Sequence, residues 1–113
     1  MSTTNTAQPP HVSNVLMFEV GGYLEKFLEI GRRANAINEK LDSPGKARVW
    51  TNYFGAAQGG RTAIVVIEYP SLVAMAQFMA RQDTSADWLK LRAEAEASGI
   101  KLLSNSVVTE LIP

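Results

Sequence analysis

The sequence predicts a single α+β domain in which a four-stranded antiparallel sheet carries helices on one face. A length of 113 residues fits one domain of ordinary size. Short segments rich in β-branched and aromatic residues alternate with longer segments whose apolar residues recur every three or four positions. Along the chain these segments follow the order strand, helix, strand, strand, helix, strand, and this order leads to the predicted sheet.

The first strand and helix are predicted between residues 15 and 41. Residues 15–20 are apolar and partly β-branched, and Gly21 and Gly22 end this strand. The helix after them is terminated by the turn-forming residues 42–45. One stripe of this helix is apolar and comprises Tyr23, Phe27, Ile30, Ala34, Ile37 and Leu41.

The second half of the chain is predicted to begin with a hairpin. Residues 47–54 alternate in polarity, residues 55–60 supply a glycine-containing loop, and residues 61–69 form the most apolar strand. Such a strand is expected to be central, because both of its faces need cover.

A broken helix and a last strand follow. Ser71 is expected to cap the second helix, which breaks near residues 82–85 and restarts behind a Ser/Thr cap. Gly99 ends the helical region, and residues 100–112 form the last strand, which we expect at an edge of the sheet.

Two right-handed crossovers around a central hairpin define a ferredoxin-like βαββαβ topology with strand order 4-1-3-2. Residues 13–113 are predicted to form this one domain. Residues 1–12, rich in Thr, Asn, Gln and Pro, are expected to be a mobile tail.

The face of the sheet away from the helices is predicted to be apolar. Residues on both parities of the central strand are apolar, so no register gives this face the alternation of a solvated sheet. A monomer would expose a large apolar patch, which favours a homodimer joined through the sheet faces. The alternative is a monomer whose tail or last helical segment covers that face. The apolar residues concerned are Val15, Met17, Trp50, Phe54, Ile64, Val66 and Val108.

Composition excludes several functional classes. Eleven Lys and Arg balance eleven Asp and Glu, which argues against a nucleic-acid partner. Without cysteine there is no disulfide, no thiolate metal site and no cysteine nucleophile. The longest apolar run, residues 63–67, is too short for a membrane helix. Because the first residues lack the pattern of a secretory signal, a cytoplasmic location without membrane contact is expected.

Several of these segments together resemble the dimeric α/β-barrel superfamily, over residues 13–113. The segments are the hairpin, the sequence IEYPSLVAMAQFM at residues 67–79, ADWLKL at residues 86–91 and the long last strand. The likeness is greatest to small members of the NIPSNAP and antibiotic-biosynthesis-monooxygenase types. The resemblance implies a homodimer whose two sheets form a barrel. It also implies that the cleft between sheet and helices can hold a hydrophobic substrate or haem.

Candidate ligand-binding residues lie on the second and third strands and on the second helix. Three of them share one face of the second strand, and Glu68 joins them there only if the hairpin register has the matching parity, which the sequence leaves open. The alternative reading is an Arg–Glu pair at the sheet margin, a packed Trp and core methionines. The candidates are Arg48, Trp50, Asn52, Glu68, Tyr69, Met75 and Met79.

No cofactor or metal is predicted. Haem-degrading members of the superfamily place a His on the second helix, but residues 72–81 contain none, and the single histidine is His11. The carboxylates lack a His partner or the close spacing of metal ligands.

The sequence therefore predicts a homodimer that binds a small hydrophobic molecule in the cleft between sheet and helices. One alternative is a cofactor-independent monooxygenase, isomerase or cyclase acting on an aromatic or polyketide-like substrate. The superfamily associates such oxygenases with Asn, Trp and Tyr side chains, but no motif can be matched position by position. A purely structural interaction module is the other alternative.

Overall fold

The computed structural model describes residues 11–51, 61–109 and 111. The elements follow the predicted order, and the helical region after the hairpin is broken as expected. Most of the predicted tail and the predicted hairpin loop lie outside the described residues. The elements are β1 (Val12–Glu19), α1 (Leu24–Lys40), β2 (Lys46–Thr51), β3 (Thr62–Tyr69), α2 (Leu72–Asp83), α3 (Ala86–Ala97) and β4 (Lys101–Thr109).

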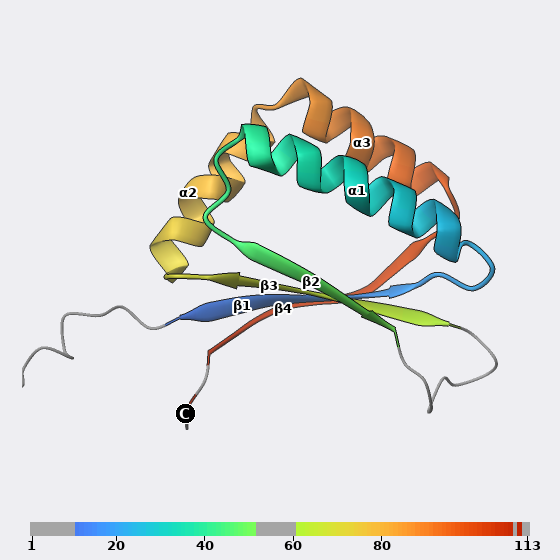
Figure 1. Ribbon diagram of the computed structural model, residues 1–113, viewed down its shortest axis with the longest axis horizontal. Helices are drawn as coiled ribbons and strands as arrows, with labels where there is room; N and C mark the ends of the chain where they lie inside the picture. Colours follow the sequence, from blue (N-terminus) through green and yellow to red (C-terminus); the bar gives the residue numbers. More distant parts are fainter. Residues whose placement is uncertain (1–10, 52–60, 110, 112–113) are drawn as a thin grey trace, which may run out of the picture.

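The four strands form one antiparallel sheet in the order β2-β3-β1-β4, which confirms the predicted strand order and the α+β ferredoxin-like class. All three helices lie on the same side of the sheet (Figure 1). The pairing of β1 with β4 shifts register between Met17 and Phe18. The most apolar strand, β3, is internal, as its composition predicts.

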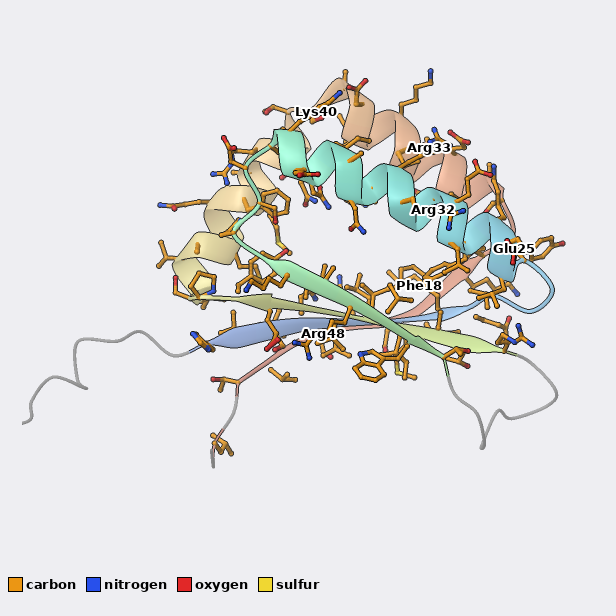
Figure 2. All side chains as sticks on the ribbon, viewed as in Figure 1. Phe18, Glu25, Arg32, Arg33, Lys40 and Arg48 are labelled. Carbon is orange, nitrogen blue, oxygen red and sulfur yellow. The ribbon has the colours of Figure 1, made fainter. Side chains whose placement is uncertain are left out.

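The register decides which residues face the helices. Val12 lies opposite Tyr69, and Phe18 lies opposite Ala63. All four belong to the packed helix-facing side, where Phe18, labelled in Figure 2, contacts Phe27 of α1 with ring centroids 5.3 Å apart. Because side chains alternate along a strand, the residues between them point to the opposite side, which we call the open face.

Local signals set the ends of the helices. Gly21 has φ +50° in the turn before α1, and Asp42 has φ +57° in the turn after it, so both adopt the left-handed region. Ser71 caps α2 by accepting a hydrogen bond from the Ala74 amide at 3.1 Å. Ser85 caps α3 by accepting from the Trp88 amide at 3.2 Å, which confirms the predicted restart. None of the described helices has the length and apolar character needed to cross a membrane.

The interior between sheet and helices is divided into two apolar clusters. One is centred on Val12, Tyr69, Met75 and Phe78, where α2 meets the sheet. The other is centred on Val20, Phe27 and Ala63, beneath the first turns of α1. The sheet is therefore anchored to the helical layer at two separate places.

A cluster of charges joins α1 to α3 on the outer surface. The Arg33 guanidinium donates two hydrogen bonds to the Glu94 carboxylate, at 2.7 and 2.8 Å. Lys26 lies 3.6 Å from the same carboxylate, and Glu29 lies 3.6 Å from Arg33. The hydrogen bonds from Arg33 lower the pKa of Glu94 to about 2. The helices are thus paired by a geometrically well-formed but solvent-exposed contact.

Replacement of this carboxylate is expected to have a pH-dependent effect. Because the pKa of Glu94 is lowered in the folded state, its contribution to stability is present above the unfolded pKa near 4.5 and is lost as pH falls towards 2. Glu94→Gln should therefore lower the melting temperature at pH 7, by at most a few degrees for such an exposed pair. Melting curves of parent and variant should converge between pH 4.5 and pH 2.

Glu96→Gln is the matched control on the same helix. Its carboxylate lies 3.7 Å from Arg92, and its side chain is 72% exposed, so the variant should melt close to the parent at every pH. A Glu94→Gln difference that stays constant down to pH 2 would contradict this account of the helix pair.

Candidate functional site

A cavity of about 270 Å³ lies between α1, α2 and the β2–β3 part of the sheet. One side of it is mainly apolar and comes from the sheet and α2: Ala47, Ile67, Tyr69 and Phe78. The other side is polar and comes from α1 and the connection that follows it: Asn35, Asn38, Glu39 and Ser43, with Gly45 at the edge. The two-sided lining offers both apolar and hydrogen-bonding groups, and the volume lies just below the roughly 300–1,000 Å³ typical of ligand pockets.

Close backbone approach at Gly45 shapes this cavity. A Cβ atom at position 45 would lie 2.8 Å from Ile67 Cγ2 and 2.8 Å from Tyr69 Cε1. Only glycine allows the chain entering β2 to pass so close to these side chains. The Ser43 hydroxyl accepts a hydrogen bond from the Gly45 amide at 3.1 Å and fixes the turn.

Tyr69 is the buried polar group of the cavity. It is only 3% exposed, and its ring centroid lies 6.3 Å from that of Phe78. Burial raises the pKa of the Tyr69 phenol, so the hydroxyl stays protonated at neutral pH.

The Tyr69 hydroxyl has unused hydrogen-bonding capacity. It makes no hydrogen bond within the described part of the chain, yet that part holds no fully enclosed polar side-chain atom without a partner. The hydroxyl is therefore not fully enclosed, and Tyr69 is one of the residues that line the cavity. A buried aromatic residue with an available hydroxyl is a natural anchor for a ligand.

Side chains at the end of α2 hold the polar side of the cavity in place. Arg81 donates hydrogen bonds to the carbonyl oxygens of Leu41 at 2.9 Å and Asp42 at 3.1 Å. Gln82 donates to Asn38 Oδ1 at 3.0 Å, which occupies the amide oxygen of this lining residue. These contacts tie the last turn of α1 to α2 and fix the distance between the two sides.

Asn14 is a buried polar residue on the helix-facing side that sequence reasoning missed. It is 3% exposed and donates to Asn105 Oδ1 at 2.6 Å and to the Ser106 carbonyl at 3.0 Å. These bonds join β1 to β4 and explain one polar residue in the middle of the last strand. The strand predicted from the sequence begins at residue 15, so its alternation of apolar and polar residues does not include Asn14. Asn14 could have been identified as a polar residue at a helix-facing position of the strand, between the apolar residues Val12 and Leu16.

The predicted candidates do not form one site. Glu68 does share a face with Arg48 and Trp50, because Lys46 lies opposite Glu68 and Trp50 opposite Ile64. They share the open face, however, so these three side chains point away from the cavity. This corrects the prediction that they line one cleft with the remaining candidates. Arg48 is labelled in Figure 2.

The other candidates lie on the helix side or outside the described residues. Tyr69 lines the cavity, Met75 belongs to the apolar cluster around it, and Met79 packs against that cluster. Asn52 lies outside the described residues. The sequence therefore identified one cavity-lining residue, Tyr69, and missed the polar side of the cavity.

The open face is apolar at its centre and charged at its ends. Register places its side chains in rows across the sheet, and the two central rows are apolar apart from Arg48 at one edge and two serines at the other. Trp50 is 55% exposed there. The central rows are Arg48, Val66, Val15 and Ser106, and Trp50, Ile64, Met17 and Ser104. The end rows contain Lys46 with Glu68, and Glu19 with Lys101.

No family model and no curated protein matches the chain. Its fold, however, is similar to that of several solved structures. A NIPSNAP family protein from Agrobacterium tumefaciens has a TM-score of 0.69 at 14% identity, with 93% of this chain and 88% of that chain covered. A mutant of SnoaB, a cofactor-independent oxygenase from Streptomyces nogalater, has a TM-score of 0.62 at 15% identity, with 92% and 96% covered.

A dimeric ferredoxin-like protein from an uncultured marine organism is also similar, with a TM-score of 0.61 at 14% identity and with 92% and 98% covered. At these identities the similarity defines the fold alone. The chain has the ferredoxin-like fold that its resemblance to NIPSNAP-like and antibiotic-biosynthesis-monooxygenase-like proteins implied.

Substitution of Gly45 tests the shape of the cavity. Gly45→Ala should destabilise the fold by about 1–3 kcal/mol, because the new methyl group overlaps the Ile67 and Tyr69 side chains. Gly31→Ala is the control: a Cβ at this position of α1 meets nothing within 4 Å. That variant should be more stable than the parent by about 0.5–1 kcal/mol, because alanine is favoured over glycine in a helix interior. Urea unfolding of both variants measures the difference; equal stabilities would contradict the close approach at Gly45.

Proposed function

We propose that the chain forms a homodimer through the open faces of its sheets and that each protomer binds a small molecule in the cavity beside Tyr69. The observation that carries the binding function is the available Tyr69 hydroxyl within an otherwise apolar wall. Such a wall holds the apolar body of a ligand, and the hydroxyl orients its polar group. The polar side of the cavity adds further hydrogen-bonding groups.

Binding is favoured over catalysis by the groups that line the cavity. Among the described lining residues the only carboxylate is Glu39, which is exposed. The raised pKa of Tyr69 keeps the phenol neutral, so it serves as a hydrogen-bond donor and not as a base.

The second candidate is a cofactor-independent oxygenase, isomerase or cyclase acting on an aromatic substrate. It is supported by the fold shared with SnoaB, which is a cofactor-independent oxygenase. It is also supported by the neutral Tyr69 hydroxyl, since a buried donor stabilises negative charge developing on a substrate oxygen. Oxygen uptake on addition of a naphthalenediol to the parent protein, and its loss in Tyr69→Phe, would favour this candidate.

The dimer is supported by the composition of the open face. Val15, Met17, Ile64 and Val66 form an apolar centre that no described element of the chain covers (Figure 1). A second copy presents the same apolar centre, so a two-fold axis through the sheet faces removes both patches from water. The marine protein of the same fold is itself described as dimeric.

The binding function predicts that Tyr69→Phe, which removes one hydroxyl and keeps the ring, loses affinity for the ligand. Titration with 2-phenylethanol, followed by NMR chemical shifts, should show saturable binding to the parent. The variant should bind about two- to tenfold more weakly, the usual effect of one hydrogen bond. Native mass spectrometry of freshly purified protein reports any retained ligand together with the number of subunits.

Tyr23→Phe is the control, because Tyr23 is 53% exposed and lies outside the cavity. It should leave the affinity unchanged. Equal affinity for the parent and Tyr69→Phe would remove the hydroxyl from the proposed site.

The dimer predicts that a charge in the centre of the open face prevents association. Ile64→Asp and Val66→Asp should each give monomers in light scattering, because dimerisation would bury an unpaired carboxylate. Trp50→Ala should keep the fold and weaken the dimer, since a large exposed aromatic side chain at an interface often dominates binding.

Leu72→Asp is the control, because Leu72 is 57% exposed on α2, away from the sheet face. It should remain dimeric. Unchanged dimer mass in Ile64→Asp, Val66→Asp and Trp50→Ala would show that the open face is not the interface.

A further inference from the structure

We propose that the cavity selects its ligand by charge: it takes a small amphipathic molecule whose polar end is an amine or a hydroxyl, and Glu39 disfavours a carboxylate there. The inference rests on the proposed function, because it names the ligand class of the same cavity.

The two-sided lining indicates an amphipathic ligand. The sheet and α2 supply Ala47, Ile67, the Tyr69 ring and Phe78, while α1 and its connection supply Asn35, Asn38, Glu39 and Ser43. A molecule with a flat apolar body and one polar end matches both sides at once. A purely hydrocarbon ligand would leave the polar side without partners.

The charged groups of the lining are of one sign only. Glu39 is its only carboxylate, and the described lining contains no Lys, Arg or His. A ligand carboxylate would therefore lie near a like charge without a cation to pair with. An ammonium group would lie near an opposite charge, and a hydroxyl would meet neither a penalty nor a gain.

Arg81 does not supply the missing cation. Its guanidinium lies 5.6 Å from the centre of the Phe78 ring, but Arg81 is not part of the lining. Two of its nitrogens donate to the carbonyl oxygens of Leu41 and Asp42, at the end of α1. Its charge there compensates the negative end of the helix dipole.

The hydrogen-bonding groups fit an uncharged oxygen as well as an amine. Asn38 keeps its amide nitrogen because Gln82 occupies its oxygen, and Ser43 keeps its hydroxyl proton because its oxygen accepts from Gly45. With the Tyr69 hydroxyl, these donors would hold either a hydroxyl oxygen or a carboxylate oxygen. The charge of Glu39 is what distinguishes the two.

Three probes that share one ring test the proposal. They are 2-phenylethylamine, 2-phenylethanol and phenylacetate, which at pH 7 are cationic, neutral and anionic. Calorimetric or NMR titration of the parent should show the amine binding about two- to fivefold more tightly than the alcohol. The acetate should bind more weakly than the alcohol by a similar factor, as for a partly solvated charge pair.

Glu39→Gln should bring the three dissociation constants together, because it removes the charge and keeps the size of the side chain. Glu25→Gln is the control: Glu25 is an exposed acid in the first turn of the same helix and is absent from the lining. Glu25→Gln should keep the three dissociation constants in the same order as in the parent. High salt should reduce the spread in the parent and have little effect in Glu39→Gln.

The outcomes separate the two proposals. An acetate that binds the parent as tightly as the alcohol, or an unchanged order in Glu39→Gln, would overturn charge selection and leave the binding function standing. Saturable binding of none of the three probes would overturn the binding function itself, and charge selection with it.

Discussion

The structure depends on a sheet that is apolar on both faces while helices cover only one. Side chains along β3 point alternately to the two faces of the sheet, and both sets are apolar. Val65 and Ile67 face the helices, and Ile64 and Val66 face away from them. Burying apolar surface is the main favourable contribution to folding and to association, and this is the physical reason for the proposed dimer. The helices cover one face, and no other element in the described part of the chain covers the second, which is the face of the proposed dimer contact.

The same alternation separates the proposed binding cavity from the proposed dimer surface. Ile67 and Tyr69 reach the cavity, whereas Glu68 between them points to the open face. A single strand thus contributes to two sites without sharing a side chain between them. For this reason substitutions at Ile64 and Val66 test association, those at Tyr69 test ligand binding, and neither set changes the side chains of the other site.

Sequence reasoning was sufficient for the fold and the strand order because both follow from hydrophobic periodicity and from the handedness of crossover connections. It was insufficient for the site because site residues depend on register. A shift of one position would exchange the two faces of a strand, so Arg48, Trp50 and Glu68 were equally compatible with the cleft and with the open face until the pairing of Lys46 with Glu68 was known.

The polar side of the cavity could not be predicted from the sequence for a different reason. Glu39 lies on the charged side of the predicted helix, where a solvated role is the simplest interpretation. It reaches the cavity because α1 ends over the start of β2, where Gly45 brings the chain to within van der Waals distance of Tyr69. Gly45 and Arg81, distant in sequence, together determine the position of that last helical turn. The chemistry of the cavity is therefore set by tertiary contacts that hold a surface residue beside a buried one, and no periodicity within a single element encodes such an arrangement.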